Sequence, residues 1–222
     1  CSSLCGCCCH VFLRYPCCLP SPRASRRASV MILDLVRHAA TGREAFLDGR
    51  TDPPMLPADQ QPLVHAYAQP WERVVSSPRL RALHTALALA APHGLTVVPE
   101  EEWEELDFGD WDGQPLLDLP EDALAAFHAD PHGNPPPNGE SWGHFERRMA
   151  RALARLLDDD QPPSTLVVTH GGPMRMVLSQ VCGLPLSLCW ALRIDHGTRL
   201  RLRVERNDDG AIWGELLELQ QP

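Results

Sequence analysis

The sequence predicts an α/β fold, a three-layer α/β/α sandwich with a mostly parallel central sheet. Short apolar runs alternate with helical stretches along most of the chain from residue 31 onward, an order typical of a parallel sheet. The first of these runs is almost uninterrupted by polar residues, as expected for a strand that is buried on both faces. A chain of 222 residues with 44% hydrophobic content can bury one substantial core, so we expect one domain.

The first half of the chain contains, in order, a strand at 31–36, a polar loop at 42–57, a weak helix at 58–68 and a strand at 72–77. Pro78 then fits the first turn of a helix, because the N–H that proline lacks would be unpaired there. That helix is predicted to run to about Pro92. Its apolar stripe is predicted to consist of Leu80, Leu83, Leu87 and Ala91.

The second half begins with a short strand at 95–98 and then breaks into acidic, aromatic and proline-rich loops at 100–137. The helices predicted here are a short one near 123–128, a clearly amphipathic one at 142–157 and a third at 172–182. The predicted strands are a buried one at 165–169 and three more at 188–194, 198–205 and 211–219, with a turn at 207–210.

Charge and hydropathy argue against two classes of partner. The formal net charge is −9, whereas nucleic acids and anionic membranes require clustered positive charge. No apolar run approaches the roughly 18 residues needed to span a bilayer. We therefore expect no nucleic-acid partner and no membrane partner. The sequence does not indicate the oligomeric state.

Residues 1–30 differ in composition from the rest of the chain. They contain seven of the nine cysteines, four arginines and no acidic residue. A metal tract or a disulfide knot is one interpretation, but three adjacent cysteines fit neither CxxC spacing nor a spaced disulfide framework. We expect an unstructured or non-native extension upstream of a domain at 31–222. Cys182 and Cys189 are then the only cysteines of that domain, as expected for a cytoplasmic protein.

Two predicted strands end in a histidine. The stretch MILDLVRHAAT places Arg37 and His38 at the end of the first strand, and LVVTHGG places His170 and two glycines at the end of a later one. In open α/β sheets, ligands bind at the carboxyl ends of strands, and glycines let backbone N–H groups approach them closely. Alone, each histidine could be a polar strand exit or a satisfied core residue. Together they indicate one site.

Two further segments contain candidate polar residues. Arg79 and Arg81 fall in the predicted first turn of a helix, where a cation has the wrong sign for the helix dipole, so anion binding explains them better than structure does. The stretch EELDFGDWDG at 104–113 gathers carboxylates among aromatic residues. Most acidic runs are solvated faces, so this stretch is informative only beside the others.

The four segments together resemble the histidine phosphatase superfamily, the relatives of phosphoglycerate mutase, over residues 31–219. The resemblance implies that His38 is a nucleophile that takes the phosphoryl group and that Arg37 and Arg81 bind phosphate. It makes His170 the second histidine of the pocket and Glu105 the proton donor. These five residues are the predicted catalytic set.

The resemblance also implies two minor phosphate-binding positions, the Gly171 backbone and Thr41. Arg81, and not Arg79, matches the phosphate-binding arginine of the family, which leaves Arg79 as a surface residue. The stretch at 104–113 contains other carboxylates, but Glu105 is the position that matches the proton donor.

The implied reaction is metal-independent hydrolysis of a phosphomonoester through a phosphohistidine. It needs a nucleophile, charge neutralisation at three oxygens and a proton for the leaving group. Arginine supplies fork-shaped, charge-assisted hydrogen bonds that lysine cannot match. The ten histidines show no HExxH or comparable spacing, so we predict no metal and no cofactor.

Two positions depart from the family pattern. Ala39 stands where the family usually has glycine, and its methyl group would cost roughly 1 kcal/mol if the position required a positive φ. Glu44 stands where the family often has asparagine. A carboxylate would repel a bound phosphate, so we expect Glu44 to point away or the loop to differ.

Three shorter segments look like the bacterial α-ribazole phosphatases of cobalamin assembly: GRTDPP at 49–54, NGES at 138–141 and WALRIDHG at 190–197. We therefore expect α-ribazole 5′-phosphate as the small phosphorylated substrate. One alternative is a broad-specificity phosphatase for sugar phosphates or nucleotides, and a mutase fits less well. Another is a non-catalytic module that binds a phospho-ligand, an interpretation that rests on Ala39 and Glu44.

Overall fold

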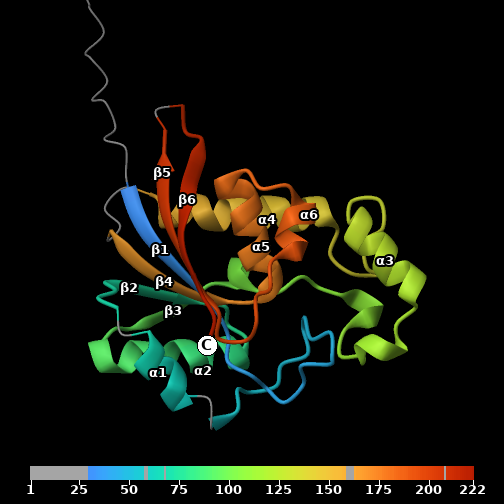
Figure 1. Cartoon of the computed structure of the whole chain (residues 1–222), viewed down its shortest axis with the longest axis horizontal. Helices are drawn as coiled ribbons and strands as arrows, with labels where there is room; N and C mark the ends of the chain where they lie inside the picture. The colour runs from blue at the N-terminus through green and yellow to red at the C-terminus, as the bar shows by residue number, and fades with distance from the viewer. Residues whose placement is uncertain (1–29, 58–59, 68, 159–162, 208) are drawn as a thin grey trace, which may run out of the picture.

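Within the described residues, a six-stranded sheet forms the centre of the molecule (Figure 1). The computed structural model describes residues 30–222 with gaps at 58–59, 68, 159–162 and 208, so all but one residue of the extension predicted at 1–30 lies outside the described residues. The strands are β1 (Val30–Arg37), β2 (Arg73–Ser76), β3 (Val97–Pro99), β4 (Ser164–Thr169), β5 (Arg199–Arg206) and β6 (Ile212–Gln220).

The strands lie in the order β3-β2-β4-β1-β5-β6. The first four are mutually parallel, whereas β5 is antiparallel to β1 and pairs with β6 as an antiparallel edge. The mostly parallel sheet predicted from the sequence is confirmed. The antiparallel edge follows from the short turn between the last two strands, which is too short for a parallel crossover.

Helices cover both faces of the sheet (Figure 1). α1 (Gln60–Ala66) and α2 (Leu80–Ala90) lie on one face, and α4 (Trp142–Leu156) and α5 (Gly171–Cys182) on the other, so the three-layer prediction is confirmed. α3 (Glu121–Ala129) and α6 (Leu186–Ala191) pack together at the margin. Short 3-10 turns occupy Ala91–His93, Glu101–Trp103, Gly109–Trp111 and Leu116–Asp118.

The predicted apolar stripe of α2 is wrong. Leu80 and Leu87 are 40% and 49% exposed, and the helix instead buries a face of small residues. Alanine side chains let the helix approach the sheet closely, so that packing is decided by shape and not by the size of the apolar side chain. The helix also begins at Leu80, after Pro78, with Arg79 at the N-cap. The buried residues of α2 are Arg81, Ala82, Thr85, Ala86, Ala88, Leu89 and Ala90.

The strand predicted at 188–194 is also wrong, because most of this segment lies in α6. Leu186, Cys189 and Trp190 share the spacing of one helical face. That face packs against the large apolar core on the α4 and α5 side of the sheet. Tertiary packing therefore decided between two readings that the local pattern allowed.

The sheet register brings the two predicted histidines together. β1 and β4 are parallel neighbours, and Arg37 lies opposite Thr169, so that His38 and His170 leave the sheet side by side. The His38 N–H donates to the Thr169 carbonyl at 2.9 Å, which continues the ladder by one step. Because β2 is the other neighbour of β4, the start of α2 with Arg81 lies at the same edge.

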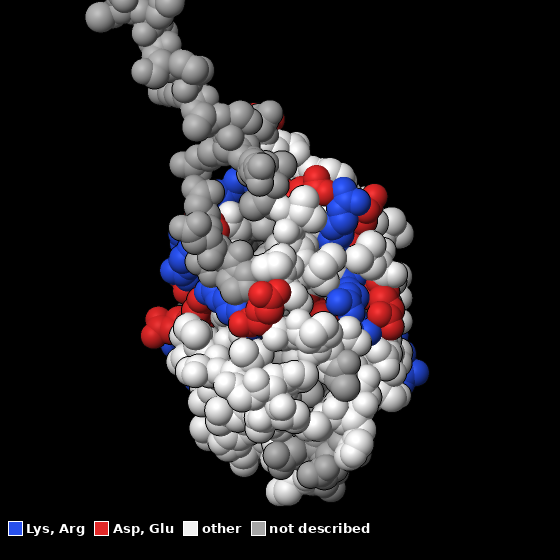
Figure 2. Space-filling model, turned by 90° about the vertical axis from the view of Figure 1, so that its left-hand side faces the viewer, with Lys and Arg blue, Asp and Glu red and all other residues white. Residues whose placement is uncertain are grey.

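Acidic and basic side chains are interspersed on the face in Figure 2, where they lie mainly in the upper part. The lower part of this view is almost free of charged side chains. Among the described residues, the structure has no helix of the length and apolarity that crossing a membrane requires.

Candidate functional site

His38 follows β1 directly and defines the site. Its side chain is 5% exposed, and its Nδ1 lies 2.8 Å from the carbonyl oxygen of Ala39. Because a carbonyl only accepts, Nδ1 carries the ring proton and Nε2 keeps its lone pair. Burial and the charges of Arg81 and Arg37 lower the pKa of His38 well below its ordinary value. The ring is therefore a neutral imidazole, and its Nε2 can act as a nucleophile.

His170 immediately precedes α5 and is almost fully buried. Its ring centroid lies 5.1 Å from that of His38, and its Nε2 lies 2.8 Å from the Ser77 hydroxyl oxygen. Burial and the charge of Arg81 hold the pKa of His170 well below its ordinary value. No protein group in the described part of the chain pairs with its Nδ1, which leaves that nitrogen available to a ligand.

Arg37 is the last residue of β1, and neutral groups hold its guanidinium. Nη1 donates to the carbonyl of Ile194 at 2.7 Å, and Nη2 lies 3.1 Å from Nε2 of His196. Nε is buried and has no partner among the described residues. Gly171 lies against this guanidinium, since a Cβ on Gly171 would sit 3.8 Å from its Cζ.

Arg81 is 1% exposed and donates to three backbone carbonyls. Nη1 donates to Thr51 at 2.7 Å, and Nη2 donates to Asp48 and Gly49, both at 2.9 Å. Its ion-pair partner Asp52 is more distant, at 3.6 Å. Because the short contacts are to neutral oxygens, much of the guanidinium charge remains uncompensated and available to an anion.

Asp112 builds the loop that receives Arg81. Its Oδ1 accepts from the N–H groups of Gly49 and Arg50, and its Oδ2 accepts from both the N–H and the hydroxyl of Thr51. Four charge-assisted hydrogen bonds to one carboxylate fix the loop backbone. The acidic stretch at 104–113 therefore contributes to the architecture of the site as well as to its chemistry.

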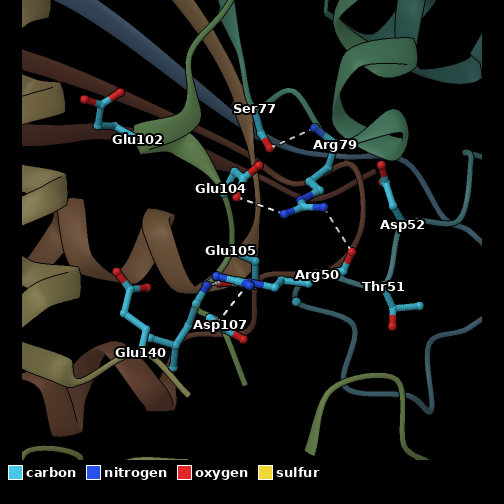
Figure 3. Close-up of polar contacts among 12 residues, drawn as sticks. Arg50, Thr51, Asp52, Ser77, Arg79, Glu102, Glu104, Glu105, Asp107 and Glu140 are labelled. Carbon is cyan, nitrogen blue, oxygen red and sulfur yellow. Dashed lines mark hydrogen bonds and ion pairs between the residues drawn. The ribbon is translucent and has the colours of Figure 1, made fainter. Parts of the chain in front are cut away.

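Arg79 connects the same two loops (Figure 3). Its Nη2 donates to Glu104 at 3.0 Å and its Nη1 to the Arg50 carbonyl at 3.1 Å, while Arg50 pairs with Asp107 at 3.0 Å. The prediction that Arg79 is a surface residue is wrong in part, because its side chain is only 23% exposed. The pocket that contains His38 is lined by Arg81 and not by Arg79.

Glu105 lies at the N-terminus of α5. Its two carboxylate oxygens accept from the Gly172 N–H at 3.1 and 3.2 Å, at the helix end that favours negative charge. A Cβ on Gly172 would overlap Oε1 of Glu105. The second glycine of the His-Gly-Gly sequence thus makes room for this carboxylate.

Replacing Gly172 with alanine should displace the Glu105 carboxylate and lower turnover of an alkyl phosphate about tenfold, as part of a general-acid contribution. The fold should survive, because the atom in the way is the end of a flexible side chain. Steady-state kinetics and the melting temperature measure the two effects. The matched control is Gly143→Ala in α4, where a Cβ would meet only Arg147 Nη1, at 3.4 Å. Unchanged turnover in Gly172→Ala would contradict the prediction.

One pocket, which we call the His38 pocket, brings most of the predicted residues together. It has a volume of about 90 Å³. Five of the seven predicted residues line it: Arg37, His38, Thr41, Arg81 and Glu105. His170 does not line this pocket, although its ring centroid lies 5.1 Å from that of His38. Gly171 lines an adjoining cavity instead. The pocket is also lined by Arg43, Glu44, Phe46, Leu47, Asp48, Phe108 and His196.

The adjoining cavity, which we call the aromatic cavity, has a volume of about 180 Å³. It shares Arg37, Leu47, Glu105 and Phe108 with the His38 pocket, so that Glu105 lies where the two meet. Arg175 stacks over the ring of Trp190 at 5.4 Å. The remaining aromatic lining consists of Phe127, His128, Trp142 and Phe145.

The two departures from the family pattern have structural answers. Ala39 does not adopt a positive φ, since Asn138 is the only non-glycine residue with one in the described part of the chain, so the methyl group causes no backbone strain there. Glu44 does not point away, because it lines the pocket. Its Oε1 accepts from the Gly42 N–H at 3.1 Å, so hydrogen bonding to the local turn occupies the carboxylate.

Sequence reasoning missed His196. Its ring centroid lies 5.0 Å from that of His38, and it reaches Arg37 from the loop before β5. Because β5 is antiparallel to β1, the residues preceding β5 meet the carboxyl end of β1. A polar residue just before a strand that is antiparallel to β1 therefore indicates a site residue as well as a polar residue just after a parallel strand does.

The residues that the structure describes contain no group of three or more His, Cys, Asp or Glu side chains placed to hold a metal ion.

Comparison with known families and sequences gives three results. The model of the histidine phosphatase superfamily (branch 1) matches residues 33–212. An adenosylcobalamin/α-ribazole phosphatase of Escherichia coli (strain K12) is 32% identical over 178 residues, which cover 75% of this chain and 87% of that protein. Phosphoserine phosphatase 1 of Hydrogenobacter thermophilus is 28% identical over 136 residues, covering 60% of this chain and 64% of that protein.

Solved structures resemble the whole domain. The α-ribazole phosphatase of Shigella flexneri has a TM-score of 0.71 at 27% identity and covers 86% of this chain and 96% of its own. A mycobacterial glucosyl-3-phosphoglycerate phosphatase has a TM-score of 0.72 at 24% identity, covering 84% of this chain and 96% of its own. The second likeness concerns the fold alone.

Proposed function

The chain belongs to the histidine phosphatase superfamily, and we propose that it hydrolyses phosphomonoesters without a metal, through a phosphohistidine formed on His38. The observation that carries this proposal is the convergence of two neutral imidazoles, two guanidiniums and one carboxylate at a single edge of the sheet. These groups come from segments far apart in the chain, and each supplies one requirement of phosphoryl transfer.

The first step is attack by Nε2 of His38 on phosphorus. Its lone pair is free because Nδ1 is bound to the Ala39 carbonyl. Arg37 and Arg81 neutralise the phosphoryl oxygens, and His170 can donate from Nδ1 when its Nε2 accepts the Ser77 hydroxyl. Because burial and the adjacent arginines keep the pKa of His38 low, the loss of activity caused by protonating His38 should begin only when the pH drops through that lowered value.

Glu105 completes the reaction from the junction of the two cavities. It donates a proton to the leaving alkoxide, and afterwards, as a carboxylate, it activates the water that cleaves the phosphohistidine. The hydrogen bonds from the Gly172 N–H orient the Glu105 side chain for both steps. The leaving group would then occupy the aromatic cavity.

Within this reaction we propose α-ribazole 5′-phosphate as the substrate, and hence a role in cobalamin biosynthesis in the cytoplasm. Two observations support it: relatives named α-ribazole phosphatases, and aromatic walls suited to a flat heterocyclic leaving group. Burial and the charge of Arg175 lower the pKa of His128, so that this wall residue is neutral. A largely aromatic wall fits the flat heterocycle of a nucleoside better than it fits phosphoserine.

A substrate panel tests both levels of the proposal. We expect kcat/KM for α-ribazole 5′-phosphate to exceed that for phosphoserine by at least about 10²-fold, with no added metal and with a chelator present. Replacing Trp190 with alanine should narrow this ratio about tenfold and leave phosphoserine turnover unchanged. Similar kcat/KM values for sugar phosphates, nucleotides and α-ribazole 5′-phosphate would favour a broad-specificity phosphatase. Saturable phosphate binding with no turnover of any ester would favour the non-catalytic module.

A further inference from the structure

The loop at 194–198 holds the end of β1 at several points. The Gly197 N–H donates to the carbonyls of Arg37 and His38 at 3.0 and 3.2 Å, and the Arg37 N–H donates to the Thr198 carbonyl at 3.0 Å. The Tyr67 hydroxyl donates to the Gly197 carbonyl from the helical layer below. The loop is therefore fixed relative to the two residues that open the pocket.

The same loop also contributes two groups that contact the Arg37 guanidinium. Ile194 accepts from Nη1 through its carbonyl, and His196 faces Nη2 through Nε2, 3.1 Å away. Because arginine has no acceptor, this contact is a hydrogen bond only if Nε2 of His196 is unprotonated. Burial and the adjacent Arg37 lower the pKa of His196 to about 4, so the ring is neutral at physiological pH.

We propose that His196 is a positioning residue for phosphate binding: it accepts a hydrogen bond from Arg37 and so fixes the plane of that guanidinium in the wall of the His38 pocket. The proposal builds on the proposed phosphatase function. With both Nη atoms directed by the loop, the unpaired Nε of Arg37 is held in one orientation. A neutral acceptor does this without cancelling the charge that phosphate needs, as a carboxylate in its place would.

The charged and titratable groups around His196 come from four segments. Arg37 and Arg81 disfavour a cationic imidazole, whereas Glu44 and Asp195 act in the opposite direction. The neutral His38 ring lies 5.0 Å from the His196 ring, centroid to centroid. If His196 becomes protonated, Nε2–H opposes the N–H of Arg37 and the hydrogen bond is lost. Acid should therefore weaken phosphate binding through this residue.

Two variants separate the acceptor from the rest of the ring. His196→Leu removes the acceptor at similar volume, whereas His196→Gln can place Oε1 near the position of Nε2. Affinity for inorganic phosphate at pH 7, measured by calorimetry, should fall about tenfold or more in His196→Leu and recover to within a few-fold of the unmutated protein in His196→Gln. Melting temperatures confirm that both variants are folded.

The pH profile gives a readout that a purely structural role would not move. The pH dependence of kcat/KM reports groups that titrate in the free enzyme. The kcat/KM of His196→Gln, divided by that of the unmutated protein, should therefore rise as the pH falls from 6 towards about 4, because a histidine at position 196 becomes protonated there and a glutamine does not. A flat ratio, or equal loss of phosphate affinity in folded His196→Leu and His196→Gln, would overturn the proposal. If the unmutated protein binds phosphate but turns over no ester, the proposed function fails, and phosphate affinity alone still tests His196.

Discussion

Replacing His38 with alanine is expected to lower turnover by at least about 10⁴-fold, because it removes the group that accepts the phosphoryl unit. The binding groups should remain in place, since none of the hydrogen bonds that hold Arg37 and Arg81 involves the His38 side chain. Phosphate affinity should therefore change far less than turnover. Steady-state kinetics and calorimetry with inorganic phosphate measure the two quantities.

A trapping experiment identifies the nucleophile directly. Rapid quenching at alkaline pH should recover a phosphorylated imidazole from the unmutated protein and none from His38→Ala. His132→Ala is the matched control, because the side chain of that histidine is 58% exposed and pairs with Glu146, away from the His38 pocket. The His132→Ala variant should keep full turnover and yield as much phosphorylated imidazole as the unmutated protein. Label that persists in His38→Ala would assign the nucleophile to another residue and contradict the mechanism.

The sequence was most informative where strands end. His38, Arg37 and His170 could be predicted because a buried parallel strand is a recognisable apolar run, and polar residues at its carboxyl end lie at the ligand-binding edge of the sheet. The two histidines lie side by side because β1 and β4 are neighbouring strands in register. The local sequence pattern does not reveal which strands are neighbours. The resemblance to a known family supplied that pairing.

The sequence was least informative where tertiary packing chose among local options. Leu80 and Leu87 of α2 face solvent because the alanine face of the helix fits the sheet more closely, and this face carries Arg81 and Thr85 inward. His196 was missed for a related reason. Its partner Arg37 is 159 residues away, and only the antiparallel course of β5 brings the two together.

The acidic stretch shows how one run divides between structure and chemistry. Asp112 and Asp107 bind or pair with the loop at 49–51, and Glu104 pairs with Arg79 (Figure 3). Among the carboxylates of this run, only Glu105 lines the His38 pocket. The spacing of these carboxylates in the sequence could not show which of them binds the loop at 49–51, which pairs with Arg79 and which lines the pocket. Neighbouring carboxylates in a loop become distinguishable only from the folded structure.

Replacing Glu105 with glutamine is the second large prediction. Glutamine can still accept the Gly172 N–H, so the loop should keep its place, but it cannot donate or accept the transferred proton. Turnover of an alkyl phosphate should fall by about 10³-fold, within the range typical of a positioned general acid and base. The Glu101→Gln control changes an exposed carboxylate of the same loop and should be nearly neutral.

The leaving group distinguishes the two functions of Glu105. p-Nitrophenolate departs without protonation, so Glu105→Gln should still form the phosphohistidine from p-nitrophenyl phosphate. It should then stall, because no carboxylate activates water, and release a burst of about one equivalent of p-nitrophenol before a slow steady state. Equal losses for both esters with no burst would mean that Glu105 only shapes the pocket. A burst in Glu105→Gln that is absent from His38→Ala would place both residues on one reaction path, with the carboxylate acting after the imidazole.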